Sequence, residues 1–284
     1  MNAIPVTDLD DPRLDPYRDL RREDVRRRGP WFIAEGRMVV QRLLASHYET
    51  VSVLAEAKRL PWVAERVSSD TPVLVISPDG MRELSGFDFH RGLLACGRRV
   101  PMLPAEALLL DQADAPSPGL SGEVALGAIA VSDAENLGSL IRTAAAFGID
   151  RLVLSRQTID PLCRRVLRVS MGTALRMRMF EMADPLGWLT ENERLGRWFT
   201  IATTLEPGAV PLSHVVSHPE FQHRPKLVLM GNEGDGLPAE ISRACTVRGV
   251  IPMASGVDSL NVAVAGGIAI YELFRHEQTG GERQ

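Results

Sequence analysis

Three polar segments of the sequence carry residue types that could bind a ligand and assist proton transfer. The first, SDAENLGSLIRTA, contains Asn136 and Arg142, and the second, GNEGDGLP, spans residues 231–238. The third contains Ser259 and Asn261. Arginine can recognise phosphate through two parallel hydrogen bonds, and three glycines in six residues let backbone N–H groups approach a ligand. Taken singly, these segments suit an amphipathic helix with one solvent-directed arginine, or a plain acidic turn, equally well.

The glycine-rich segment does not match two familiar nucleotide sites. Its order is GxxGxG rather than the GxGxxG of dinucleotide-binding folds, and no GK[ST] follows it as in a P-loop. A metal site is also not expected. The histidines His214, His218 and His223 lie in a segment broken by prolines, with no cysteine close by and no HExxH pattern.

Each polar segment follows an apolar strand. ALGAIAV, KLVLM and VRGVIPM are continuous apolar runs that alternate with helical patterns after residue 123. This alternation predicts a parallel sheet covered on both faces. Because ligands of such sheets lie beyond the carboxyl ends of the strands, the three segments are expected to form one site.

The C-terminal helix, which begins after Asn261, is apolar almost all the way round. A helix of this kind is expected to be buried on every face. Gly266 and Gly267 lie inside it, and each costs about 1 kcal/mol relative to alanine in an exposed helix. We therefore expect another element to pack very close to its backbone, within one chain or in a dimer.

The sequence before residue 123 predicts a smaller α/β domain and the segments that flank it. Residues 1–29 are interpreted as an extended arm leading into a short charged helix, and 30–100 as alternating strands and helices. Residues 101–122 are rich in proline and contain one apolar segment, EALLLDQ, interpreted as a strand within an interdomain linker. The parallel-sheet domain then spans 123–284.

The composition is that of an ordinary globular protein, with 284 residues, 45% of them hydrophobic, and a formal net charge of −4. Cys96, Cys163 and Cys245 are far apart, which suits a reducing compartment without disulfides or a cysteine zinc site. Neither a secretory signal nor a run of about 18 apolar residues is evident, so a cytoplasmic protein without membrane spans is expected.

The basic residues are almost all arginine, and they occur in clumps. Only Lys58 and Lys226 are lysines among the 32 basic residues. Clumped arginines could bind phosphate groups, or they could form solvated faces paired with nearby acids.

Together, the three segments resemble the motifs of the SpoU/TrmH family of RNA 2′-O-ribose methyltransferases, in the SPOUT superfamily. The motifs read NLGSLIRTAAAFGI, LVLMGNEGDGL and IPMASGVDSLNVAVAGGIAIYE, and the resemblance covers residues 124–274. FIAEGRMVVQRLLAS and HRGLLA resemble the substrate-binding domain that often precedes this catalytic domain. The resemblance implies a deep trefoil knot, a homodimer formed through the catalytic domain, and bound S-adenosylmethionine. The implied cofactor-binding residues are Thr204, Leu205, Gly231, Ile251, Met253 and Leu260.

The resemblance also implies a set of catalytic residues. Arg142 is the family-matching residue for the ribose hydroxyl, and a guanidinium, which stays protonated at neutral pH, suits orientation and oxyanion stabilisation better than proton abstraction. Asn136 would position the substrate or Arg142. Glu233 would hold the arginine through a carboxylate fork and accept a proton indirectly. Ser259 and Asn261 would line the pocket near the ribose.

The expected substrate is single-stranded or looped RNA, where a 2′-hydroxyl is accessible. Ribosomal RNA is favoured slightly over transfer RNA because of the N-terminal domain. The arginines expected to bind it are Arg98, Arg99, Arg164, Arg165 and Arg168. Two alternatives are a non-catalytic RNA-binding or ribosome-assembly factor on the same scaffold and a methyltransferase for small molecules or proteins.

Overall fold

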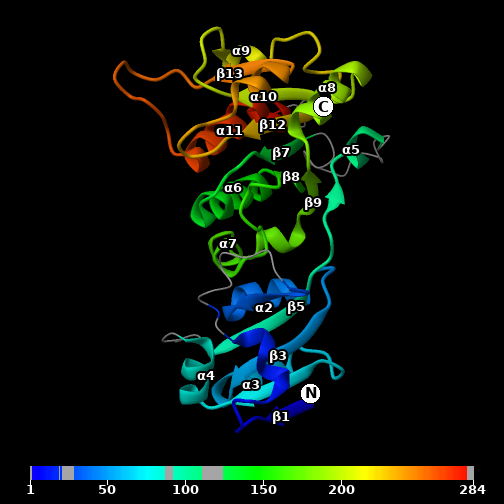
Figure 1. Ribbon diagram of the computed structural model, residues 1–284, viewed down its shortest axis with the longest axis vertical. Helices are drawn as coiled ribbons and strands as arrows, with labels where there is room; N and C mark the ends of the chain where they lie inside the picture. The colour runs from blue at the N-terminus through cyan, green and yellow to red at the C-terminus, as the bar shows by residue number, and fades with distance from the viewer. Residues whose placement is uncertain (1, 19, 21–28, 87–91, 111–123, 280–284) are drawn as a thin grey trace. The chain divides into compact units, whose positions relative to one another are not determined.

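The protein is described by a computed structural model that covers residues 2–18, 20, 29–86, 92–110 and 124–279 (Figure 1). The chain divides into two compact units, and each is described by itself. The first unit contains Met1–Pro101 and Asp160–Arg176, and the second contains Met102–Ile159 and Met177–Gln284. The chain therefore passes from one unit to the other at three points.

The first unit is built on a five-stranded sheet with the order β1-β4-β3-β5-β2. Strand β5 is antiparallel to both of its neighbours, whereas β1 and β3 are parallel to β4. The strands are β1 (Asn2–Pro5), β2 (Trp31–Glu35), β3 (Thr50–Glu56), β4 (Pro72–Ile76) and β5 (Leu93–Arg98). The helices are η1 (Pro12–Tyr17), α2 (Gly36–Leu44), η2 (Ala57–Arg59), α3 (Leu60–Ala64), α4 (Pro78–Ser85), α7 (Arg164–Val169) and η3 (Thr173–Arg176).

The N-terminal stretch differs from the extended arm that the sequence suggests. Strand β1 pairs with β4, and Leu14, Tyr17 and Leu20 are fully buried in the core of the first unit. The Tyr17 hydroxyl shares a buried hydrogen bond of 2.7 Å with Ser52. Apolar side chains spaced three residues apart in a charged segment thus mark a packed face. The expected charged helix falls mostly on 21–28, outside the described residues.

The segment Asp160–Arg176 belongs to the first unit, although the sequence places it inside the parallel-sheet domain. Two ion pairs hold it there: Arg164 Nη1 lies 2.6 Å from Glu35 Oε2, and Arg99 Nη1 donates to Asp160 Oδ1 at 3.1 Å. Helix α7 also packs on β2. A segment that connects two strands of one sheet can belong to a different unit. The periodicity of the strands does not reveal to which unit the connecting segment belongs.

The second unit has an eight-stranded sheet with the order β11-β13-β10-β12-β7-β8-β9-β6, in which every paired strand is parallel. The strands are β6 (Leu103–Pro104), β7 (Val124–Ala128), β8 (Arg151–Ser155), β9 (Arg178–Met182), β10 (Phe199–Thr203), β11 (Val210–Pro211), β12 (Lys226–Met230) and β13 (Val247–Val250). The helices are α5 (Ala107–Leu110), α6 (Ala134–Ala146), α8 (Pro185–Leu195), α9 (Leu212–Val215), α10 (Ala239–Ala244) and α11 (Val262–Thr279).

The predicted parallel α/β fold is confirmed. Strands β7, β8 and β12 are buried along their whole length, as their continuous apolar sequences require. Within the expected linker, Ala107–Leu110 of the EALLLDQ segment form helix α5 rather than a strand, and Leu108 and Leu109 are buried in the core of this unit. The trefoil knot concerns how the chain threads, and it stays a prediction of the family resemblance.

Helix α11 packs side by side with α6 (Figure 1). A Cβ at Gly266 would overlap the buried side chain of Leu140 on α6, so the glycine permits this close approach within one chain. The expectation that α11 is buried on every face is wrong for the single chain. Val264, Ile268 and Tyr271 are 53%, 39% and 55% exposed, and their spacing places them on one side of the helix.

Within the described residues, no helix is long and apolar enough to cross a membrane.

Candidate active site

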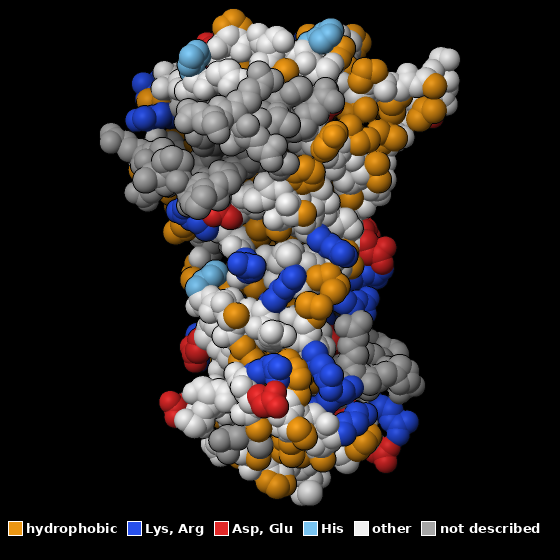
Figure 2. All heavy atoms as spheres, turned by 180° about the vertical axis from the view of Figure 1, so that it is seen from behind, with side chains coloured by type: hydrophobic (Ala, Val, Ile, Leu, Met, Phe, Trp, Pro, Cys, Tyr) orange, Lys and Arg blue, Asp and Glu red, His pale blue; other side chains and the backbone are white. Residues whose placement is uncertain are grey.

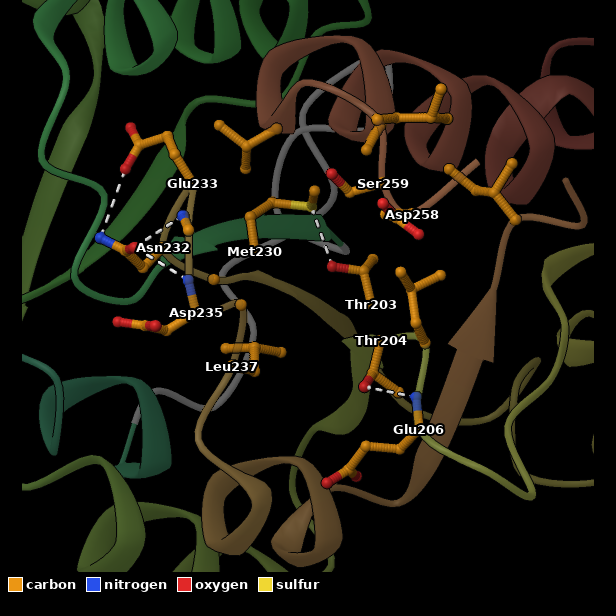
Figure 3. A pocket seen from close by; sticks show the side chains of 18 of the residues that line it. Thr203, Thr204, Glu206, Met230, Asn232, Glu233, Asp235, Leu237, Asp258 and Ser259 are labelled. Carbon is orange, nitrogen blue, oxygen red and sulfur yellow. Dashed lines mark hydrogen bonds between the residues drawn. The ribbon is translucent and has the colours of Figure 1, made fainter. Parts of the chain in front are cut away.

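The loops that follow β10, β12 and β13 surround a cavity at the carboxyl end of the second sheet (Figure 3). Its volume of about 690 Å³ is in the range of small-molecule sites. All six residues predicted to bind the cofactor line it: Thr204, Leu205, Gly231, Ile251, Met253 and Leu260. Glu233 and Ser259, from the predicted catalytic set, line it as well.

The glycine-rich turn after β12 is closed by its own hydrogen bonds. Asn232 and Gly236 exchange two backbone hydrogen bonds of 3.0 Å, and Asn232 Oδ1 accepts from the N–H groups of Gly234 and Asp235. A Cβ at Gly231 would overlap the backbone of Gly236 and Leu237, so no other residue fits there. The glycine therefore makes the tight turn against which a ligand can lie.

The carboxylate of Glu233 connects this turn to the loop after β7. Its Oε1 accepts from the Asp133 N–H at 3.0 Å and from Asn136 Nδ2 at 3.1 Å. Its Oε2 accepts from the N–H and the hydroxyl of Ser132, both at 3.2 Å, and from Asn232 Nδ2 at 3.4 Å. These donors occupy the lone pairs of both oxygens.

These contacts also set the charge of Glu233. Burial raises the pKa of its carboxyl group, but the hydrogen bonds from Asn136, Asp133 and Ser132 outweigh burial and lower the pKa below its usual 4.5. Glu233 is therefore ionised at neutral pH and acts as an acceptor of hydrogen bonds.

The third loop joins the same network through two amides. Asn261 Nδ2 donates to Asn136 Oδ1 at 2.8 Å, while Asn136 Nδ2 donates to Glu233. Asn261 Oδ1 accepts from the N–H groups of Ala263 and Val264, and so caps helix α11. A continuous chain of hydrogen bonds thus links the three segments that the sequence singled out.

Arg142 lies apart from this network. Its side chain is exposed on α6, it does not line the cavity, and it makes no hydrogen bond or ion pair within the described part of the chain. Arg142 follows Asn136 by six positions along the helix, which turns the two side chains about 120° apart. The expected carboxylate fork between Glu233 and Arg142 is therefore wrong, because the Glu233 oxygens already hold the 132–136 loop.

Three residues of the network were not predicted as site residues: Ser132, Asp133 and Asn232. A signal existed for Asp133, since aspartate before an apolar-periodic helix is a common N-cap. Its Oδ1 accepts from the N–H groups of Glu135 and Asn136, so Asp133 caps α6. For Ser132 the sequence holds no comparable signal.

The arginines predicted to bind RNA all belong to the first unit, and they divide by exposure. The side chains of Arg99 and Arg164 are only 22% and 13% exposed within the ion pairs that hold Asp160–Arg176, so direct RNA contact by these two is not supported. Arg98 is half-exposed and paired with a glutamate. Arg165 and Arg168 are exposed on α7.

Among the described residues, no cluster of histidine, cysteine and acidic side chains could hold a metal ion.

Comparison with known proteins identifies the family. The SpoU rRNA Methylase family model matches residues 123–271. A Mycobacterium tuberculosis protein named as an uncharacterized tRNA/rRNA methyltransferase is 38% identical over 277 residues, which cover 95% of this chain and 91% of that protein. The chain belongs to the SpoU rRNA methylase family.

Two further relatives of this SpoU-family chain have more specific names. The 23S rRNA (guanosine-2′-O-)-methyltransferase RlmB of Acinetobacter baylyi is 30% identical over 201 residues, covering 70% of this chain and 76% of that protein. The crystal structure of an AdoMet-bound rRNA methyltransferase from Sinorhizobium meliloti superposes with a TM-score of 0.77 at 26% identity, covering 96% of this chain and 98% of that one. The family match confirms the predicted class of RNA methyltransferase.

The lowered pKa of Glu233 makes its contribution to stability depend on pH. A carboxyl group whose pKa falls on folding stabilises the folded state above its ordinary pKa of 4.5, and this stabilisation is lost as pH falls below 4.5. We expect Glu233→Gln to lower the melting temperature at pH 7 and the difference from wild type to shrink as pH falls below 4.5. Thermal unfolding across pH measures this, with exposed Glu193→Gln as the control. A difference that stays constant with pH contradicts it.

The turn after β12 offers a matched pair of glycines. Gly231→Ala should lower stability by about 1–3 kcal/mol through overlap with backbone that cannot move aside. It should also abolish S-adenosylmethionine binding measured by calorimetry. At Gly234 a new Cβ has only an ordinary contact, 3.5 Å from Asn232 Oδ1, so Gly234→Ala should leave affinity and stability nearly unchanged. Equal behaviour of the two variants would refute this account of the turn.

Proposed function

We propose that this SpoU-family protein methylates a ribose 2′-hydroxyl of ribosomal RNA at the loops around Glu233. The observation that carries the proposal is the hydrogen-bonded chain Glu233–Asn136–Asn261 beside the cavity. The 2′-O and 23S rRNA specificity named for RlmB supports ribosomal RNA over transfer RNA. The dispersed cysteines suit an enzyme that works in the reducing cytoplasm.

The cavity suits S-adenosylmethionine, which supplies a methyl group on a positively charged sulfur. The charged side chains that line it are all acidic: Glu206, Glu233, Asp235 and Asp258. Gly231 allows the tight turn that forms one side of the cavity, while Leu205, Ile251 and Leu260 provide apolar walls. These residues would hold the cofactor, and the surrounding loops would limit the access of water.

Asn136 and Asn261 would align the ribose. Each side-chain amide has one N–H that the network does not use, because Asn136 Nδ2 donates to Glu233 and Asn261 Nδ2 donates to Asn136. A side-chain amide whose oxygen and nitrogen both form hydrogen bonds can hold a hydroxyl in place without moving. Alignment of the hydroxyl oxygen with the methyl group and the sulfur accounts for much of the rate in an in-line displacement. Ser259, which lines the cavity, would contact the same sugar.

The proton of the ribose hydroxyl needs an acceptor other than Glu233. The lone pairs of this carboxylate are already taken by backbone and side-chain donors, and its lowered pKa makes it a weak base. Glu233 therefore acts as a positioning residue. A phosphate oxygen of the substrate or solvent would take the proton.

Arg142 would meet the RNA from outside the cavity. Its exposed guanidinium can bind the phosphate next to the target ribose and stabilise negative charge on the oxygen. The same exposure allows Arg142 of one chain to serve the site of a second copy.

The function is tested by mapping ribose methylation of total RNA with and without the gene, then restoring the gene as Arg142→Ala. We expect one ribosomal site to be lost, and Arg142→Ala to reduce its methylation by at least about 100-fold. Calorimetry should give that variant nearly normal S-adenosylmethionine affinity. Arg243→Ala, another exposed helical arginine, is the control.

Each contrary result has a distinct meaning. Near-normal methylation by Arg142→Ala would remove this residue from the mechanism. Failure of the wild-type protein to bind S-adenosylmethionine would favour a non-catalytic RNA-binding factor instead.

The first unit would bind RNA phosphates through Arg165 and Arg168. Both side chains are exposed on α7, and Arg37 is exposed on α2, the helix that contacts η3 in the same unit. Lys and Arg side chains, with acidic ones between them, are spread over this unit in Figure 2. Exposed arginines on one unit can bind RNA phosphates although the whole chain has a net charge of −4.

Removing two phosphate contacts should change the salt dependence of binding. We expect Arg165→Ala/Arg168→Ala to reduce the slope of log affinity against log salt by about 1.5. A double variant elsewhere in the first unit, Arg66→Ala/Arg82→Ala, removes two other exposed arginines and should leave the slope unchanged. Fluorescence anisotropy with ribosomal RNA fragments measures this, and identical slopes for both double variants would exclude α7 from the RNA surface.

A second copy of the chain would cover the exposed side of α11. Val264, Ile268 and Tyr271 form an apolar stripe, and an uncharged surface of this kind suits another protein chain better than RNA. We expect the wild-type protein to sediment as a dimer and Ile268→Glu as a monomer. Leu186→Glu, at an equally exposed position on α8, should remain dimeric. A monomeric wild type, or a dimeric Ile268→Glu variant, would contradict this interface.

A further inference from the structure

Glu206 occupies the part of the cavity that the methyl-transfer network leaves unused. It follows β10 in the loop Thr204–Glu206, and its N–H donates to Thr204 Oγ1 at 3.1 Å, which fixes the loop. Figure 3 shows Glu206 on the opposite side of the cavity from Glu233 and Ser259. Its side chain is 24% exposed.

The carboxylate of Glu206 is oriented but incompletely bonded. Arg248 Nη1 lies 3.7 Å from Glu206 Oε2, which is close enough for an ion pair and too far for a hydrogen bond. Oε2 is buried, and within the described part of the chain it accepts no hydrogen bond. A buried carboxylate oxygen without a donor is unfavourable, and a bound ligand with a suitable donor would remove this cost.

The position of Glu206 restricts which part of S-adenosylmethionine can supply that donor. The reacting methyl must face the ribose site at Asn136 and Asn261, so Glu206 meets a part of the cofactor far from the methyl. The amino-acid carboxylate would be repelled by Glu206. Leu237 and Ile251 line the same cavity and provide apolar surface that suits a purine.

We propose that Glu206 is a cofactor-recognition residue that accepts a hydrogen bond from the adenosine moiety, either from a ribose hydroxyl or from the exocyclic amine. Carboxylates at the ends of parallel strands take ribose hydroxyls in dinucleotide-binding folds, so the chemistry is well suited to this place. Arg248 holds the carboxylate towards its partner. This inference rests on the proposed use of S-adenosylmethionine and assigns one end of its binding site.

Calorimetry with S-adenosylhomocysteine and 5′-methylthioadenosine tests whether Glu206 acts on adenosine. Glu206→Ala should weaken both ligands by about tenfold, because both contain the adenosine moiety. Glu206→Gln, which keeps the shape of the side chain, should weaken both to a smaller extent. Glu240→Gln removes an exposed acid on α10 that does not line the cavity, and it should change neither affinity by more than about twofold. Thermal unfolding confirms that each variant is folded.

Competition with adenosine analogues identifies the donor. In the wild type, one of 2′-deoxyadenosine, 3′-deoxyadenosine and purine riboside should bind about tenfold more weakly than adenosine, and in Glu206→Ala this difference should disappear. If a deoxy analogue is the weaker ligand, the donor is the ribose hydroxyl that it lacks. If purine riboside is the weaker ligand, the donor is the exocyclic amine.

Two results would overturn the inference. One is unchanged affinity of Glu206→Ala and Glu206→Gln for both ligands. The other is a loss confined to S-adenosylhomocysteine, which would move the contact to the ammonium of its amino-acid part. If the wild-type protein binds neither S-adenosylmethionine nor S-adenosylhomocysteine, the proposed function fails, which is a different outcome.

Discussion

The candidate site depends on one ionised carboxylate held by donors from separate parts of the chain. Glu233 accepts hydrogen bonds from the loop after β7 and from its own turn after β12, and through Asn136 it reaches Asn261 ahead of α11. A charged group with filled lone pairs favours a single arrangement, because any displaced loop leaves a donor or an acceptor unpaired. The loops therefore keep one geometry in which the amides of Asn136 and Asn261 are fixed before a substrate arrives.

The parallel sheet makes this convergence possible. Strands β7 and β12 are neighbours in the sheet, so the loops at their carboxyl ends begin close together. Two close approaches then complete the arrangement. Gly266 lets α11 pack against Leu140 of α6, and Gly231 lets the glycine-rich turn fold back on the backbone of Gly236. Both glycines carry out a packing task that a single methyl group would prevent.

Much of the fold and the cavity could be predicted from the sequence. Continuous apolar strands identified the parallel sheet, and the motif resemblance placed Gly231, Ile251 and Leu260 around one cavity. These features depend on local patterns and on backbone positions within motifs. The partners of individual side chains could not be predicted in this way. Arg142 was expected beside Glu233. The turn of helix α6 between Asn136 and Arg142 instead directs the arginine away from Asn136, which is the residue that bonds Glu233.

Long-range burial was equally hidden in the sequence. Arg99 and Arg164 look like phosphate ligands in a basic clump, yet they form ion pairs that hold Asp160–Arg176 on the first unit. A sequence does not reveal which acid will face an arginine after folding. The stripe of α11 shows the converse case, because its apolar side chains stay 39–55% exposed in the described part of the chain.

The most direct test of the central claim is a double-mutant cycle of kcat/KM for methyl transfer with Asn136→Ala and Asn261→Ala. If the two amides act as one unit fixed by Glu233, the double variant should lose little more activity than the worse single variant, with a coupling energy of at least about 1 kcal/mol. Losses that simply add would mean that the two side chains act independently, and the hydrogen-bonded network would not be the basis of the site.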